Sequence, residues 1–494
     1  MEFSLNWKKY LTFFAAGLFS VIIFLQHYCG IQHFEEYRVF GTARLHAIQI
    51  AQSVIVILIC CFSGGIIAET SGYNKVKCMV LLLVMYGFID IQTLKDGVYY
   101  YSASIYELWP LLPFLAGVYF LIKYEKTGAI KYRIAAPILF GAASFYHDRI
   151  ATMTVFFLLI YTFWEYRKEK KFSRYLLILN AIAVICLVSA IIISKNRLDP
   201  QLFGEFYSEG ILERIVGNIL PVMRVNIGCN NLFLTVLVTL AGGGAAYVYF
   251  KREILLEISF LFVSFFFMDQ IFEISMIVSD TVRIIWFFIY FILFIVYYLK
   301  RKQYLLFTLL ISGCSSQGML LRSPSIMPQM HIVMVIILQI LSGSFIADIL
   351  ANHKKDESKW IKVRDGGIVL IFSLMSFFIL LYNVQDYKMG YEVKEGNWYT
   401  DSWLGESATI SFTAETEQTI VVSLTNAGNV EDMEISCLYQ GEEAIFKILP
   451  SEIYQFEIEI LEGTSDMILE ASEVFEPNNG DVRKLSVLLN ITNE

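Results

Sequence analysis

The fold class follows from residues 134–166, which read IAAPILFGAASFYHDRIATMTVFFLLIYTFWEY. Two apolar runs flank the polar triplet His147-Asp148-Arg149. One continuous helix would place this triplet near the middle of a bilayer, where charged side chains are costly. We therefore predict two short membrane helices, 134–147 and 149–166, that meet at the triplet.

The same apolar character extends over most of the chain. Of 494 residues, 56% are hydrophobic and 17% are charged, and the mean hydropathy is +0.57. Soluble proteins are roughly half apolar and a quarter charged. Because about 20 apolar residues cross a bilayer core, the sequence predicts a polytopic α-helical membrane protein with about 13 transmembrane helices, at residues 10–30, 47–67, 78–94, 108–124, 134–147, 149–166, 175–194, 231–250, 254–272, 284–299, 304–321, 332–350 and 366–383.

Lysine and arginine residues predict the orientation of these helices. With the N-terminus in the cytoplasm, 23 basic residues fall in cytoplasmic segments and 10 in outer ones. Cytoplasmic loops are enriched in Lys and Arg, so this orientation is favoured, and an odd number of spans places the C-terminus outside. We expect a multi-pass protein of a bacterial plasma membrane.

Residues 384–494 form a second predicted domain, outside the membrane body of residues 1–383. Their net charge is −17, whereas the first 383 residues have +9, and the acidic balance argues against nucleic acid as a partner. From Gly390 the apolar residues alternate, which is typical of strands. Seven or eight strands predict an all-β sandwich resembling a jelly roll, at 408–412, 419–424, 433–439, 444–449, 454–460, 467–471 and 484–491.

Neither the cysteines nor the glycine run indicates a metal or phosphate site. The eight cysteines include no Cys-x-x-Cys pattern, so we predict neither a zinc site nor a disulfide framework. Gly242-Gly243-Gly244 has no strand before it and no Gly-Lys-Ser/Thr after it. The run therefore indicates close helix packing rather than phosphate binding.

Ionisable residues gather at the predicted outer ends of the spans. Glu35 and Glu36 follow the first span, close to Arg38, and Glu107 opens the fourth. A carboxylate held at the membrane surface can take a proton from a hydroxyl that attacks an activated donor, and solvated loop acids are the alternative. We predict Glu35 and Glu36 as catalytic and Arg38 as substrate-binding.

The corner at His147, Asp148 and Arg149 is the second candidate. Arg149 could hold a phosphate with His147 as a further donor, or Asp148 and Arg149 could pair to close the turn. Arg283, near the start of the tenth span, is another phosphate-binding candidate. Arg322, at the end of the eleventh span beside Ser323-Pro324, either holds a phosphate or snorkels to the surface.

In the second domain, Trp398 and Trp403 lie on either side of Asp401. Aromatic faces can stack on sugar rings, so both are candidates for glycan binding. A first strand with tryptophans in its core is the alternative.

The chain resembles the GT-C superfamily of polytopic glycosyltransferases, particularly bacterial surface-polysaccharide members. The resemblance rests on the acidic pair after the first span, the corner at His147-Asp148 and the late Ser323-Pro324. It implies a GT-C-like membrane domain, a polyprenyl-phosphate-linked sugar donor, a glycan or lipid-linked acceptor, and a base at Glu35 or Glu36. The tail is similar to β-sandwich appendages of such enzymes at Asp401-Ser402-Trp403-Leu404-Gly405 and at Phe475-Glu476-Pro477.

This chemistry needs no nucleotide cofactor. A divalent metal is compatible with it but not required, since arginine neutralises phosphate. Two alternatives stay open: a non-enzymatic polysaccharide transporter or assembly factor, and an O-antigen-polymerase-like enzyme using Arg197, Arg214 and Arg224 in the long outer loop. Oligomeric state is not predicted.

Overall fold

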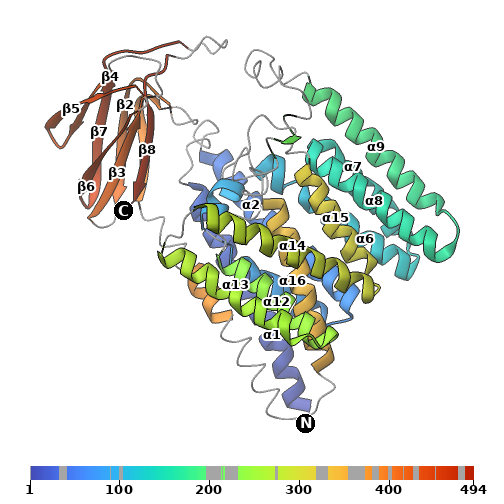
Figure 1. Cartoon of the computed structure of the whole chain (residues 1–494). Helices are drawn as coiled ribbons and strands as arrows, with labels where there is room; N and C mark the ends of the chain where they lie inside the picture. The colour runs from blue at the N-terminus through green and yellow to red at the C-terminus, as the bar shows by residue number, and fades with distance from the viewer. Residues whose placement is uncertain are drawn as a thin grey trace. The chain divides into compact units, whose positions relative to one another are not determined.

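The structure is a computed structural model (Figure 1). It describes residues 2–32, 42–89, 91–99, 104–195, 213, 215, 216, 218, 232–272, 276–318, 332–353, 373–380, 389–398, 403–414, 417–426, 433–450, 452–476 and 484–493. The chain divides into two compact units: a helical one of residues 1–28 and 46–381, and a second one of residues 29–45 and 382–494, which contains the β-strands.

Helices occur over or within each stretch predicted to cross the membrane. They are α1 (Glu2–Gln32), α2 (Thr42–Ser71), α3 (Lys75–Tyr86), α6 (Leu111–Thr127), α7 (Ile130–Tyr146), α8 (Asp148–Glu169), α9 (Arg174–Lys195), α12 (Leu232–Phe250), α13 (Glu253–Phe272), α14 (Met276–Lys300), α15 (Tyr304–Gly318), α16 (Ile332–His353) and a last helical stretch over residues 373–380.

The helical unit has the properties of a membrane protein. Within the described residues, five helices are long and apolar enough to cross a membrane: Ala47–Ser71, Ser104–Thr127, Arg174–Ile192, Thr281–Lys300 and Ile332–Ala351. Several helices also expose large apolar side chains, such as Ile138 at 66%, Ile185 at 65% and Leu261 at 70%. Lipid tails would solvate such side chains, whereas water would not.

The break between α7 and α8 confirms the predicted corner. α7 ends at Tyr146, His147 has an extended backbone with φ −151° and ψ 140°, and α8 begins at Asp148. Asp148 lies in the first turn of α8, where a negative charge is favoured by the helix dipole. The corner therefore holds its polar residues at helix ends.

The predicted span 78–94 is not one continuous helix. α3 ends after 12 residues, about 18 Å of helix, and the chain continues through α4 (Ile91–Leu94) and two π-helical turns, η2 (Lys95–Tyr99) and η3 (Ser104–Leu108). Leu94, Val98 and Ser104 are fully buried. Irregular backbone at membrane depth is tolerated where protein covers it, so the neighbouring helices make this break possible.

Polar side chains of other helices bond to the broken segment. The carbonyl of Met85, at the end of α3, accepts a hydrogen bond from Gln339 Nε2 at 2.9 Å, and the carbonyl of Val84 accepts one from Ser376 Oγ at 2.7 Å. Both carbonyls also accept backbone hydrogen bonds, Val84 from Gly87 N and Met85 from Phe88 N. A carbonyl oxygen has two lone pairs, so the side chains add a second bond to each. A local apolar pattern cannot reveal these side-chain bonds, because their donors come from residues more than 250 positions away.

The glycine run packs α12 against its neighbours, as predicted. A Cβ atom on Gly243 would lie 2.1 Å from Ser259 Oγ of α13, and one on Gly242 would lie 2.8 Å from the Tyr290 ring of α14. Only glycine permits this approach.

The second unit is a sandwich of two antiparallel sheets. One sheet has the order β1-β2-β7-β4-β5 and the other β6-β3-β8. Side chains such as Ile410, Phe412 and Val422 form one buried core from both sheets. The strands are β1 (Met389–Trp398), β2 (Leu404–Ala414), β3 (Gln418–Thr425), β4 (Met433–Tyr439), β5 (Glu442–Ile448), β6 (Ile453–Ile460), β7 (Gly463–Ala471) and β8 (Leu488–Asn493).

The structure differs from the predicted strands at two places: it has a first strand, β1, that was not among them, and it divides the stretch 484–491. β1 pairs with β2 through a register that shifts at Val393 to Glu395, and this irregular strand has little alternation to reveal it. The stretch 484–491 is instead an isolated bridge between Phe475 and Leu485 followed by β8.

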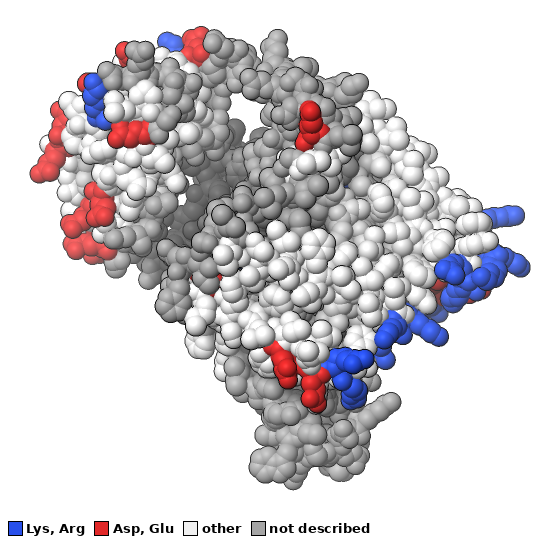
Figure 2. Space-filling view, viewed as in Figure 1, with Lys and Arg blue, Asp and Glu red and all other residues white. Residues whose placement is uncertain are grey.

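Charged side chains are unevenly distributed. Figure 2 shows Lys and Arg gathered along the lower right end of the helical unit, away from its largely uncharged sides, and Asp and Glu on the β-sandwich. The turns that follow α8 and α12 carry Lys170, Lys171, Lys251 and Arg252. Both turns were predicted to be cytoplasmic.

Candidate functional site

Several predicted site residues lie outside the described part of the chain. These are Glu35, Glu36, Arg38 and Arg322, together with Arg197, Arg214 and Arg224 of the long outer loop. The structure places the remaining candidates: His147, Asp148, Arg149, Arg283, Trp398 and Trp403.

Arg149 lies in a buried ion pair with Glu107. Its Nη1 donates to Glu107 Oε1, and the two side chains are 4% and 6% exposed. Arg149 comes from the first turn of α8 and Glu107 from η3. Because isolated buried charges are very unfavourable, each residue neutralises the other.

The end of α15 completes this cluster. Arg149 Nη2 donates to Gln317 Oε1, and Arg149 Nε donates to the Ser316 carbonyl, each at 3.4 Å. Three segments that are distant in sequence therefore meet at the guanidinium. We name Glu107, Arg149, Ser316 and Gln317 the Arg149 cluster.

A hydrogen-bond network places η3 where Glu107 can reach Arg149. Gln52 Nε2 of α2 donates to the Val98 carbonyl at 2.7 Å and to Ser104 Oγ at 2.8 Å. Trp109 Nε1 donates to Gln52 Oε1. The first residue of η3 is thus tied to a neighbouring helix, which fixes the turn that carries Glu107.

Two polar atoms of the Arg149 cluster are buried and have no hydrogen-bond partner among the described residues. They are Glu107 Oε2, an acceptor, and Gln317 Nε2, a donor. Buried polar atoms are nearly always bonded. An unused acceptor and an unused donor in one cluster are therefore suited to a ligand that both donates and accepts.

Partly exposed side chains adjoin the Arg149 cluster in sequence. Tyr106 is 42% exposed, and its ring centroid lies 5.8 Å from that of His147. His147 Nδ1 lies 3.5 Å from Asp148 Oδ1, and their side chains are 27% and 30% exposed. The corner thus combines a buried charged part with a half-exposed aromatic and polar part.

The sequence indicated the corner but not its partners. Glu107 was noted only as an ionisable residue at the start of a span, and Gln317 carried no signal of its own. Gln317 lies five positions before Arg322, so the predicted phosphate-binding segment directly follows the end of α15 that joins the Arg149 cluster.

Arg283 forms a second ion pair, on α14. Its Nη2 donates to Asp269 Oδ2 at 2.7 Å, and Ser279 Oγ donates to the same oxygen at 2.6 Å. Arg283 Nε is buried and has no hydrogen-bond partner in the described part of the chain, and the whole side chain is 20% exposed. This guanidinium therefore keeps a donor and some access to the surface.

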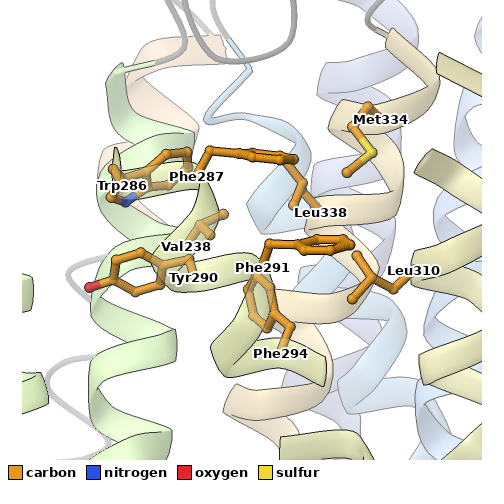
Figure 3. A pocket seen from close by; sticks show the side chains of 9 residues that line it. All are labelled: Val238, Trp286, Phe287, Tyr290, Phe291, Phe294, Leu310, Met334 and Leu338. Carbon is orange, nitrogen blue, oxygen red and sulfur yellow. The ribbon is translucent and has the colours of Figure 1, made fainter. Parts of the chain in front are cut away.

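An apolar crevice lies beside α14 (Figure 3). Its two polar atoms are already bonded: Trp286 Nε1 donates to Thr239 Oγ1 at 2.8 Å, and Tyr290 OH lies 2.5 Å from Ser259 Oγ. Among the described lining residues, these two polar groups are therefore already in use, and the other side chains are apolar. Its lining comprises Val238, Trp286, Phe287, Tyr290, Phe291, Phe294, Leu310, Met334 and Leu338.

Both candidate tryptophans of the β-sandwich take part in its packing. Trp398 is partly buried and packs against the core. Trp403 is partly buried, bridges to Leu488 and contacts the Phe475 ring edge-on at 5.4 Å. These contacts agree with the structural alternative.

Two titratable groups of the sandwich are shifted from their ordinary pKa. Lys394 Nζ donates to Asp466 Oδ1 at 2.8 Å and holds the pKa of that carboxyl below its usual range. Burial raises the pKa of the Cys437 thiol to about 11. Among the described residues of the whole chain, no group of three or more His, Cys, Asp or Glu side chains is arranged to hold a metal ion.

Comparisons with known proteins add little. No protein-family model matches the chain, and no curated protein matches it. A solved structure titled "Xyl-CBM35 in complex with glucuronic acid containing disaccharide" matches 20% of this chain and 80% of its own, at 9% identity and a TM-score of 0.14. At this TM-score, the similarity carries no weight for fold or function.

Proposed function

We propose that the chain is a membrane glycosyltransferase with a GT-C-like body of about 13 transmembrane helices. It transfers a sugar from a polyprenyl-phosphate-linked donor to a cell-surface glycan or lipid-linked acceptor on the outer face of a bacterial plasma membrane. The β-sandwich lies on the same side of the membrane.

The observation that carries this proposal is the Arg149 cluster. Glu107, the corner of α7 and α8, and the end of α15 were each predicted to lie at outer helix ends, and their side chains meet around one guanidinium. Buried ionisable residues within a membrane body are a recognised sign of a functional site. Two unused polar atoms in the same cluster support this interpretation.

The two described arginines differ in their availability for a phosphate. Arg149 is 4% exposed and its charge is balanced by Glu107. Arg283 is more exposed and retains an unbonded Nε. We therefore assign the donor phosphate to Arg283 or Arg322, and the activation of the acceptor hydroxyl to Glu35 or Glu36.

Surface glycan analysis tests the transferase. Cells that lack the chain would be complemented with wild type, Glu35→Gln, Glu36→Gln or the double variant. We expect a glycan substituent to be lost without the chain and in the double variant. Glu253→Gln, an exposed acid at the start of α13, is the control that should restore it.

Each outcome of this experiment has a distinct meaning. Unchanged glycans in cells that lack the chain would refute the transferase. If the double variant restored the glycan substituent, only the catalytic role of Glu35 and Glu36 would be refuted, and the transferase would stand.

The broken segment between α3 and α6 favours a second candidate, a polysaccharide transporter. Discontinuous helices covered by protein form the substrate sites of many transporters, and η2 and η3 are such elements. A lipid-linked precursor that accumulates inside cells lacking the chain would support transport. An unmodified polymer outside the cell would support transfer.

A further inference from the structure

We propose that the corner of Tyr106, Glu107, Arg149 and Gln317 binds an uncharged sugar ring rather than a phosphate. The inference deepens the proposed function and rests on it for the choice of a sugar among uncharged hydroxylated ligands. It assigns the ligand chemistry of this corner, which the sequence had left open.

Charge excludes a phosphate as the natural ligand of Arg149. The guanidinium is 4% exposed and already bonds to Glu107, and the two formal charges cancel. Asp148, directly before Arg149 in the chain, adds a negative charge at the corner. An anion would have to displace Glu107 and leave a buried carboxylate without a partner, which is strongly unfavourable.

The unused hydrogen-bonding atoms fit a hydroxyl group. Glu107 Oε2 can only accept when ionised, and Gln317 Nε2 can only donate. A sugar hydroxyl does both at once, whereas a phosphate oxygen would meet repulsion from the carboxylate. Both atoms are buried, so a sugar that bonds to them must enter the corner beside the exposed Tyr106.

The exposed part of the corner provides an apolar face. The Tyr106 ring is 42% exposed and stands beside His147. Sugar rings have apolar C–H faces that pack on aromatic rings, and Tyr also offers a hydroxyl. Arg149 is then a positioning residue. It bonds to the Oε1 atoms of Glu107 and Gln317, which leaves Glu107 Oε2 and Gln317 Nε2 for the ligand.

Binding of simple glycosides tests this proposal without requiring turnover. The full-length protein in lipid nanodiscs would be titrated by saturation-transfer NMR with methyl glycosides of glucose, galactose, mannose and N-acetylglucosamine, and separately with inorganic phosphate. We expect saturable binding of at least one glycoside. Tyr106→Ala and Gln317→Leu should each weaken it about fivefold to tenfold, as expected for one lost contact.

The variants and controls are chosen to preserve the fold. Tyr106 is partly exposed, and Gln317→Leu keeps the side-chain size without adding charge. Tyr166→Ala is the control for the tyrosine, since Tyr166 is 37% exposed near the other end of α8. Asn180→Leu is the control for loss of a buried amide, because Asn180 on α9 donates from Nδ2 to Thr162 Oγ1 of α8 at 2.8 Å. It shows whether removing a buried amide and its hydrogen bonds elsewhere weakens glycoside binding by itself. Both controls should bind the glycoside as wild type does.

Three results would overturn the proposal. The first is no binding of any of the four glycosides. The second is equal binding by wild type and both test variants. The third is saturable phosphate binding that displaces the glycoside. If the purified protein binds a glycoside through Tyr106 and Gln317, but cells that lack the chain have unchanged surface glycans, the inference is upheld and the transferase is refuted. Sugar transfer that does not depend on Tyr106 or Gln317 would do the reverse.

Discussion

Replacing Arg149 by methionine should strongly destabilise the helical unit. The substitution leaves the Glu107 carboxylate, 6% exposed, without its charged partner. It also removes the hydrogen bonds to Gln317 Oε1 and to the Ser316 carbonyl. Removing one partner of a buried ion pair costs about 3–5 kcal/mol, so the free energy of unfolding should fall by roughly that amount.

The second substitution should reverse most of this loss. Glu107→Met together with Arg149→Met removes both charges of the pair, and apolar replacement of a whole buried pair is often neutral. A double-mutant cycle should therefore give a coupling energy of roughly 2–3 kcal/mol between the two positions.

Unfolding by SDS in mixed micelles, followed by circular dichroism, measures these free energies. Lys168→Met is the control, because Lys168 pairs with Glu165 on the same helix at 3.7 Å while 65% exposed. Such exposed pairs contribute about 0.2–1 kcal/mol. If Arg149→Met were no more destabilising than Lys168→Met, or if the double variant were no more stable than the singles, the ion pair would not be the buried, coupled unit described above.

Three further predictions concern packing, pH and orientation. Gly243→Val should lower the free energy of unfolding by roughly 1–3 kcal/mol, since its Cβ would overlap Ser259. Gly244→Ala is the control and should unfold like wild type, because the nearest atom to its Cβ is 3.8 Å away. Comparable losses of stability in the two variants would contradict the close packing of Gly243 on Ser259. The pKa of Asp466 is lowered in the folded chain by Lys394, so the pair stabilises the fold above the unfolded pKa of Asp and ceases to do so as the pH falls through the folded value. The thermal midpoints of wild type and Lys394→Met should therefore differ at pH 7 and converge in acid; an equal difference at both would refute the assignment. Cys437, with its pKa near 11, should resist a membrane-impermeant maleimide at pH 8. In intact cells, Glu443→Cys, at an exposed position of β5, should be labelled and Lys170→Cys should not. The opposite labelling pattern would show that the chain has the opposite orientation in the membrane.

Most element positions could be predicted from local patterns. The corner between α7 and α8 was predicted from one triplet, because charge within an apolar run is costly wherever the helix lies. The alternation beyond Gly390 similarly indicated strands. The stretch 78–94 misled, since its apolar residues satisfy the pattern of a spanning helix although α3 ends at Tyr86.

The candidate site was predictable only in part. His147, Asp148 and Arg149 are identifiable from their position, and the sequence left two roles open for Arg149: a phosphate ligand, or a partner of Asp148. Neither alternative named Glu107, with which Arg149 forms an ion pair. Gln317 is an uncharged residue at the end of an apolar run, and nothing local distinguishes it. Trp398 and Trp403 had two interpretations, and their packing in the sandwich agrees with the structural one.

By itself, the sequence determined that the body is apolar enough for a membrane, that an acidic β-rich segment follows it, and that a polar corner interrupts residues 134–166. These properties depend on hydropathy and charge, which act along the chain at short range. The tertiary structure alone shows what Arg149 contacts. Its partners Glu107 and Gln317 are 42 and 168 residues away in the chain. Only the packing of η3, α8 and α15 brings them within hydrogen-bond distance, so no local pattern in the sequence could reveal the buried ion pair.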